Sequence, residues 1–152
     1  EAQAVLEDGI IQVAEVLLTS RRAFLPYAPL AHGDDDVHRW VREELVPSGG
    51  VTVACAGRAV VGVLATGCEA GVSWIHQLYV APDHVGQGIG SRLLTHALRR
   101  LPPPVRFYTF QANVRAHTFY ERHGFRAVAW TDGKANEERC PDVLFERAQP
   151  LP

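Results

Sequence analysis

Hydrophobic residues recur with a helical spacing in the first third of the chain. Apolar side chains between residues 10 and 18 lie three and four positions apart, which predicts one buried helix face. A second helix is predicted over about residues 35–46, because three consecutive aspartates favour a helix start and Pro47-Ser48-Gly49-Gly50 ends the pattern. Between the two helices, Pro26-Tyr27-Ala28-Pro29 predicts an irregular connection.

The middle of the chain changes to the spacing of strands. Residues 51–56 and 59–65 are rich in small and β-branched apolar side chains, and Gly57-Arg58 between them is typical of a hairpin turn. A third strand is predicted over residues 72–80. Strict alternation along this strand places Trp74, His76, Leu78 and Val80 on one face, and Ile75, Gln77 and Tyr79 on the other.

The remaining elements alternate between helix and strand. The patterns predict a helix over about residues 89–101, a strand over 105–110, a helix over 113–123 and strands over 125–130 and 143–147. Three prolines follow the first of these helices and Gly124 follows the second, both typical stop signals. The order of elements indicates a single α/β domain over residues 1–152, with a hairpin ahead of a β–α–β crossover.

The composition argues against several classes of partner. The chain has 152 residues and a formal net charge of -2, so no general attraction to nucleic acid is expected. No apolar run is long enough to cross a bilayer and the first residues lack a signal-peptide pattern, so no membrane partner is expected. The three separated cysteines suit neither a disulfide framework nor a zinc site, which predicts a cytoplasmic protein without a metal.

The strongest chemical signal is a glycine-rich turn between the third strand and the following helix. Residues 78–94 read as the end of a strand, a turn with Gly86, Gly88 and Gly90, and the first turns of a helix. Such a turn presents unpaired backbone N–H groups at the positive end of a helix dipole. The sequence therefore predicts an anion site suited to a pyrophosphate.

Two common nucleotide motifs do not fit this turn. A Walker loop needs a lysine before its serine or threonine, whereas Ser91 follows Gly90 directly. A dinucleotide fingerprint starting at Gly86 would need its third glycine at position 91. A turn without any ligand is the structural alternative, but three alternating glycines cost backbone entropy without a packing reason.

Two linked motifs resemble the GCN5-related N-acetyltransferase (GNAT) superfamily. Gly88 and Gly90 match the glycines of its acetyl-CoA loop, although Val85 stands where arginine or glutamine is usual. Residues 113–125 match the second signature, Asn-x-x-Ala-x-x-Phe-Tyr-x-x-x-Gly-Phe, at every specified position. The resemblance covers about residues 51–147.

The resemblance implies the GNAT fold, a central and mostly antiparallel sheet with its crossover at the CoA site. It implies acetyl transfer from acetyl-CoA to a primary amine of a small molecule or peptide, by direct attack in a ternary complex. Dimers are common in the family, which makes a homodimer one possible state, but the sequence does not fix the oligomeric state. The implied cofactor contacts are Leu78, Tyr79, Val80, Val85, Gly86, Gln87, Gly88, Ile89, Gly90, Ser91, Asn113 and Tyr120.

The resemblance also suggests the catalytic groups. Tyr120 is the expected general acid for the leaving thiolate, because a phenol keeps its proton at neutral pH. His76 and Glu138 are two alternatives for the general base. Each of these residues has a structural alternative, as a core tyrosine, a hydrogen-bonded strand histidine or an exposed loop carboxylate. Asn113 is expected to be a helix N-cap as well as a cofactor contact.

The acceptor side is less defined. In the family it is lined by the first two helices and the last hairpin, which here contribute Arg22, Phe24, Pro26, Tyr27, Trp40, Trp130 and residues 136–142. A different class of function is a catalytically weak acetyl-CoA-binding sensor or partner module of the same fold. The presence of Tyr120 and Asn113 favours an enzyme.

Overall fold

The computed structural model describes residues 2–26 and 32–151 and contains the elements in the predicted order. The α-helices are α1 (Ala2–Phe24), α2 (Asp34–Trp40), α3 (Ile89–Arg100) and α4 (Val114–Arg122). The strands are β1 (Val51–Ala56), β2 (Ala59–Glu69), β3 (Val72–Val80), β4 (Val105–Phe110), β5 (Arg126–Trp130) and β6 (Asp142–Arg147). Tyr27, Ala28 and Pro29 of the predicted irregular connection lie outside the described residues.

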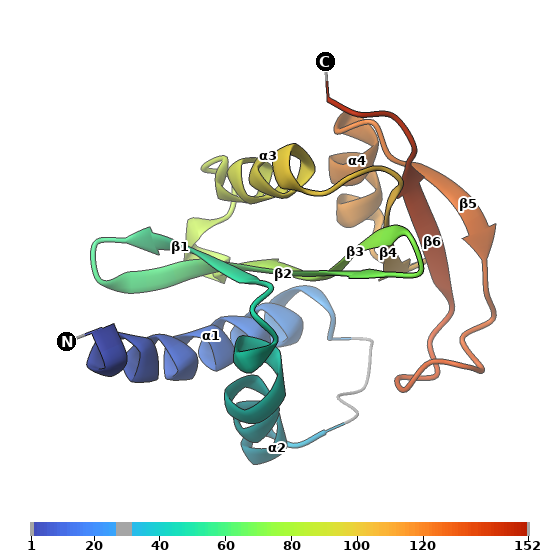
Figure 1. Ribbon diagram of the computed structural model, residues 1–152. Helices are drawn as coiled ribbons and strands as arrows, with labels where there is room; N and C mark the ends of the chain where they lie inside the picture. Colours follow the sequence, from blue (N-terminus) through green and yellow to red (C-terminus); the bar gives the residue numbers. More distant parts are fainter. Residues whose placement is uncertain (1, 27–31, 152) are drawn as a thin grey trace.

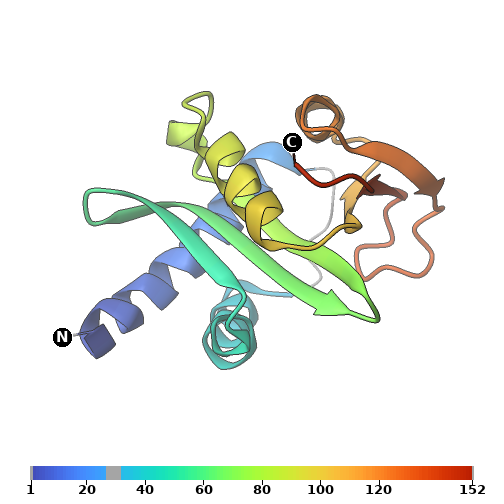
Figure 2. The ribbon, with the colours of Figure 1, turned by 45° about the horizontal axis from the view of Figure 1, so that its top comes forward.

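One six-stranded sheet organises the molecule (Figure 1). Its order is β1-β2-β3-β4-β6-β5, and the β3–β4 pair is parallel whereas the other neighbours are antiparallel. Helices α1 and α2 cover one face, and α3 and α4 cover the other (Figures 1 and 2). The predicted α/β class with a mostly antiparallel sheet is therefore confirmed. Within the described part of the chain, no helix is long and apolar enough to cross a membrane.

Each face of the sheet has its own hydrophobic core. On one face Leu93, Leu94 and Leu98 of α3 pack with Phe107 and Phe145 of the sheet. On the other face, the buried stripe of α1 packs with Val41, Leu45, Val63 and Ala65. Both cores follow the predicted periodicities, because the apolar positions three and four apart are the ones that become buried.

Several boundaries differ from the predictions. Helix α1 extends beyond the predicted 10–18 stripe at both ends, and β2 continues four residues past Ala65. The second helix does not stay α-helical to residue 46: a π-helical turn, Val41–Leu45, and a 3₁₀ turn, Val46–Ser48, follow α2. The chain then leaves this helix through Gly49, whose positive φ suits a C-terminal glycine.

The alternation predicted for β3 is wrong at its centre. Gln77 pairs with Ala65 while Ile75 pairs with Thr66, so His76 is an extra residue in a β-bulge. Because of this extra residue, Ile75 before the bulge and Leu78 after it face the same side of the sheet, the α3 core. Tyr79 faces the other side and packs against the α1 core. Strict alternation cannot foresee one unpaired residue.

Strands β3 and β4 separate soon after they meet. Their parallel ladder has two pairs, Ser73 with Val105 and Trp74 with Arg106. Beyond Trp74, β3 remains paired with β2 up to Val80, while β4 follows β6. The backbone edge of β3 that faces β4 therefore opens into a gap in the sheet, including the Leu78–Val80 stretch.

Candidate active site

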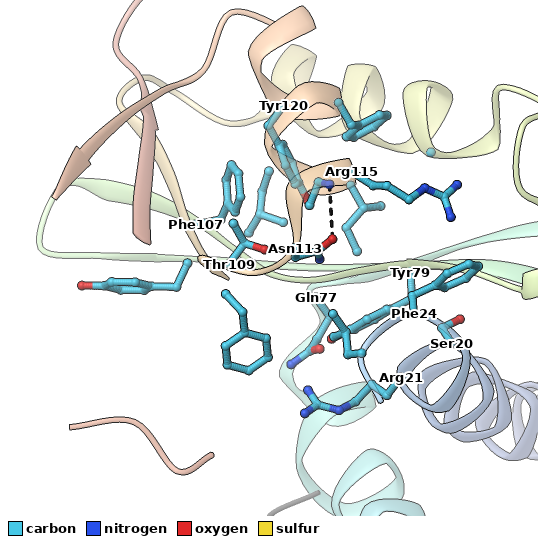
Figure 3. Close-up of a pocket in the computed structure, with 18 of the residues that line it drawn as sticks. Ser20, Arg21, Phe24, Gln77, Tyr79, Phe107, Thr109, Asn113, Arg115 and Tyr120 are labelled. Atoms are coloured by element: carbon cyan, nitrogen blue, oxygen red, sulfur yellow. Dashed lines mark hydrogen bonds between the residues drawn. The ribbon is translucent and has the colours of Figure 1, made fainter. Parts of the chain in front are cut away.

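A large cleft fills the gap between β3 and β4. Its volume is about 870 Å³. The end of α1, the second half of β3, the glycine turn, the end of β4, the start of α4 and the β5–β6 loop all line it. Figure 3 shows Tyr120 and Asn113 on one side of this cleft, and Ser20 and Arg21 of α1 on the other. The cleft thus joins both faces of the sheet.

The glycine turn forms one end of the cleft. Gly86 and Gly88 have φ values of 80° and 81°, which a residue with a side chain adopts only with strain. Gly88 is the N-cap of α3, and its carbonyl accepts the N–H of Arg92 at 3.0 Å. The N–H groups of residues 89–91 precede this first helical bond. They are therefore the unpaired donors that an anion at a helix N-terminus requires.

The predicted cofactor residues gather at this cleft with one exception. Leu78, Tyr79, Val80, Val85, Gly86, Gly88, Ile89, Gly90, Ser91, Asn113 and Tyr120 line it. Gln87 does not line the cleft and is exposed, because it lies on the outer side of the turn between the two glycines. The prediction that Gln87 is a contact residue is thus unsupported by its position.

Asn113 occupies the predicted capping position. Its Oδ1 accepts the N–H of Ala116 at 3.3 Å, which satisfies one of the first donors of α4 (Figure 3). Gly124, with a positive φ, closes the same helix as predicted. Both ends of α4 are therefore set by local residues, and the helix holds Tyr120 at the cleft.

Tyr120 is a buried phenol at the cleft, with an exposed fraction of 7%. Its ring centroid lies 3.6 Å from that of Phe107, and Phe119 and Phe125 contact it edge-on. Burial, with a smaller effect from Tyr79, raises the pKa of Tyr120 well above its ordinary value of 10. The hydroxyl therefore remains protonated through the neutral range. Among the described residues no hydrogen bond engages it.

His76 lies at the cleft but leans away from β4. A Cβ built on Gly67 would lie 3.0 Å from the Nε2 atom of His76, so the imidazole covers the backbone of β2. The residue is exposed. This orientation follows from the bulge, which removes His76 from the regular ladder.

Glu138, in the β5–β6 loop, also lines the cleft. Its side chain is 20% exposed, and its Oε1 atom is 3.6 Å from Nη2 of Arg21. The loop is held by the nine-tenths-buried Asp142, whose carboxylate accepts hydrogen bonds from Thr131 and from Asn136. Within the described part of the chain, no hydrogen bond engages the Glu138 carboxylate, so its oxygens can accept a proton.

The structure places some of the expected acceptor-side residues at the cleft and others away from it. Phe24 lines the cleft, whereas Arg22, Pro26, Trp40 and Trp130 do not. The sequence reasoning missed Arg21, which lines the cleft with Ser20. A partial signal was present: a step of three positions from Leu17 and from Leu18 gives Ser20 and Arg21, although a step of four from Leu18 also gives Arg22.

Comparison with known proteins agrees with this geometry. Residues 47–127 match the acetyltransferase (GNAT) domain family, which is more than half of the chain. Comparison of the sequence with curated proteins gave no match.

Several solved structures share the fold. The chain is similar to PH1933 of Pyrococcus horikoshii OT3, with a TM-score of 0.73 and 22% identity over 93% of this chain and 91% of that one. It is also similar to PaiA N-acetyltransferase of Thermoplasma acidophilum in complex with coenzyme A, with a TM-score of 0.69 and 19% identity over 93% of this chain and 94% of that one. For Naa50 of Arabidopsis thaliana in complex with the bisubstrate analogue CoA-Ac-MVNAL, the TM-score is 0.64 and the identity is 20% over 80% of this chain and 84% of that one.

The fold and the glycine turn together define an acetyltransferase architecture. The chain belongs to the GNAT acetyltransferase family. Among the described residues, no group of three or more His, Cys, Asp or Glu side chains could hold a metal ion.

Proposed function

We propose that this protein is an N-acetyltransferase that moves an acetyl group from acetyl-CoA to a primary amine. One observation carries the proposal: a single cleft of about 870 Å³ connects the helix N-terminal donors of the glycine turn with Tyr120 and Glu138. An anion site, an acid and a base on one cleft are the groups that amine acylation requires.

The residues at the turn fit a pyrophosphate. The N–H groups of residues 89–91 precede the first bond of α3, and a Cβ built at Gly90 would already lie 3.4 Å from the Phe119 ring. A larger side chain there would fill the space next to the turn. The open edge of β3 at Leu78–Val80 would hold the extended arm of the cofactor. Acetyl-CoA supplies the activated acetyl group when it is bound.

In this proposal two side chains that line the cleft handle the protons. Glu138 accepts one proton from the acceptor ammonium, which frees the nitrogen lone pair for attack on the thioester carbon. As the C–N bond forms and the C–S bond breaks, Tyr120 gives its proton to the leaving sulfur. The second proton of the amine restores the Tyr120 hydroxyl, and Glu138 returns its proton to water.

Glu138 suits the role of base better than His76 does. Glu138 faces the cleft from a loop fixed by Asp142, whereas the imidazole of His76 leans over β2. The acceptor is an amine of a small molecule or of a peptide. The bisubstrate analogue in the Naa50 structure supports a peptide amine as one candidate.

Acetyl-CoA is expected to raise the melting temperature in a thermal-shift assay, whereas ATP and NAD are not. Gly88→Ala should reduce this shift because it distorts the turn that holds the N–H donors. Gly57→Ala is the matched control, since Gly57 also has a positive φ and open space around it but lies in the β1–β2 hairpin. No shift with acetyl-CoA, or an equal loss in both variants, would contradict the proposed cofactor site.

Tyr120→Phe is expected to lower turnover by about 10²-fold, the scale of a lost general acid, and to leave the affinity for acetyl-CoA within about twofold. Thiol release with spermidine, glycinamide and a pentapeptide with a free N-terminus measures turnover. Tyr108→Phe is the control, because Tyr108 also lines the cleft but is 54% exposed. Unchanged turnover in Tyr120→Phe would remove this residue from the acid role. Acetyl-CoA binding without release for any amine would favour a sensor.

Glu138→Gln and His76→Gln separate the two candidate bases in a pH–rate profile of kcat/KM. We expect Glu138→Gln to remove the acidic limb and to lower the plateau by about 10²-fold, because glutamine cannot accept the proton. His76→Gln should retain the limb. The reverse pattern would assign the base to His76.

A further inference from the structure

Arg21 connects the first helix of the chain to the loop that carries Glu138. Its Nη2 atom lies 3.6 Å from Oε1 of Glu138, and the two side chains are 18% and 20% exposed. Helix α1 and the β5–β6 loop, which this contact joins, both line the cleft. The neighbouring carboxylate of the same loop, Glu137, pairs with His32 at 3.4 Å, but those two side chains are 70% and 58% exposed. The Arg21–Glu138 contact is therefore the more buried of these two.

The position of Arg21 is fixed by its neighbours. Ser20, which is fully buried, donates a hydrogen bond to the carbonyl of Val80 at 2.9 Å and ties the end of α1 to the end of β3. The Arg21 guanidinium also lies over the Phe110 ring, 5.9 Å from its centroid. A guanidinium that extends from an anchored helix end and lies over an aromatic ring directs its charge to a defined place.

The guanidinium retains capacity to bind an oxygen. Its Nε and Nη2 atoms are buried and, among the described residues, have no hydrogen-bond partner. These atoms form one edge of the guanidinium, the edge that can engage a carboxylate with two parallel bonds. Leaving such donors unpaired costs free energy, so this edge favours a nearby carboxylate.

Besides Glu138, the side chain of Tyr79 also interacts with Arg21. Burial raises the pKa of Tyr79, whereas the positive charge of Arg21 and a hydrogen bond with the Arg21 side chain oppose this rise. Other charged side chains lining the cleft are Asp132 and Asp142 of the loop side and Arg115 of α4. Asp142 is engaged by Thr131 and Asn136, and the Arg115 guanidinium lies 5.1 Å from the Phe24 ring centroid. Arg21 is thus the cation paired with Glu138.

We infer that Arg21 is a positioning residue: it holds the Glu138 loop against α1 and keeps the Glu138 carboxylate aimed at the acceptor end of the cleft. This inference rests on the proposed function, in which Glu138 takes one proton from the acceptor ammonium. An N–H bond breaks, an O–H bond forms on Glu138, and water later receives that proton. Arg21 does not exchange a proton in this step, because a guanidinium stays charged throughout.

The first test needs no acceptor. Arg21→Met should speed amide hydrogen exchange across residues 136–140 by about three- to tenfold in the unliganded protein, because the loop loses its contact with α1. The exchange rate in Arg21→Lys should lie between those of the unaltered protein and Arg21→Met, because lysine keeps the positive charge but lacks the paired N–H donors of arginine. The matched controls are Arg22→Met, which removes an exposed arginine paired with Asp34, and Glu137→Gln in the same loop. Equal exchange in Arg21→Met and Arg22→Met would overturn the inference.

The second test is a double-mutant cycle in turnover, with the amine panel named above. Arg21→Met should lower kcat by about tenfold with the acetyl-CoA thermal shift intact, and Arg21→Met with Glu138→Gln should be no slower than Glu138→Gln alone. Additive losses would mean that Arg21 does not act through Glu138. An unaltered protein that neither binds acetyl-CoA nor releases thiol would instead refute the proposed function, so the two failures are distinguishable.

Discussion

The separation of β3 from β4 is the constraint on which the site depends. Two paired residues on each strand, Ser73 and Trp74 with Val105 and Arg106, begin a parallel ladder that then stops. A continuous sheet would use the backbone edge of β3 for pairing and would fill the cleft with side chains. Because the strands diverge, the edge of β3 is exposed at the cleft, and elements from both faces of the sheet can meet there.

Helix capping and turn chemistry then decide what the cleft presents. Gly86 and Gly88 let the chain enter α3 with three N–H groups unpaired, and Asn113 begins α4, the helix that places Tyr120 at the cleft. A phenol surrounded by Phe107, Phe119 and Phe125 keeps its proton because its anion would be poorly solvated. Local sequence therefore determines the conformation of the glycine turn and the position of Tyr120 on α4, and both line the same cleft.

This locality explains how much could be predicted. The element order, the glycine turn and the Asn113 cap depend on residues close together in the chain, and the structure contains all three. The bulge at His76 could not be predicted, because it depends on which residue of β2 pairs with Gln77. The Arg21–Glu138 contact joins residues that are 117 positions apart in the sequence (138 minus 21), and no local pattern indicates such a pair.

The central claim is that the N–H groups at the start of α3 bind the pyrophosphate of acetyl-CoA. The most direct measurement is an amide ¹H–¹⁵N NMR titration of the unaltered protein with acetyl-CoA. The account predicts that the largest shifts include the amides of Ile89, Gly90 and Ser91, while the β1–β2 hairpin amides at Gly57 and Arg58 stay unchanged. Saturable binding that leaves residues 89–91 unshifted would contradict it.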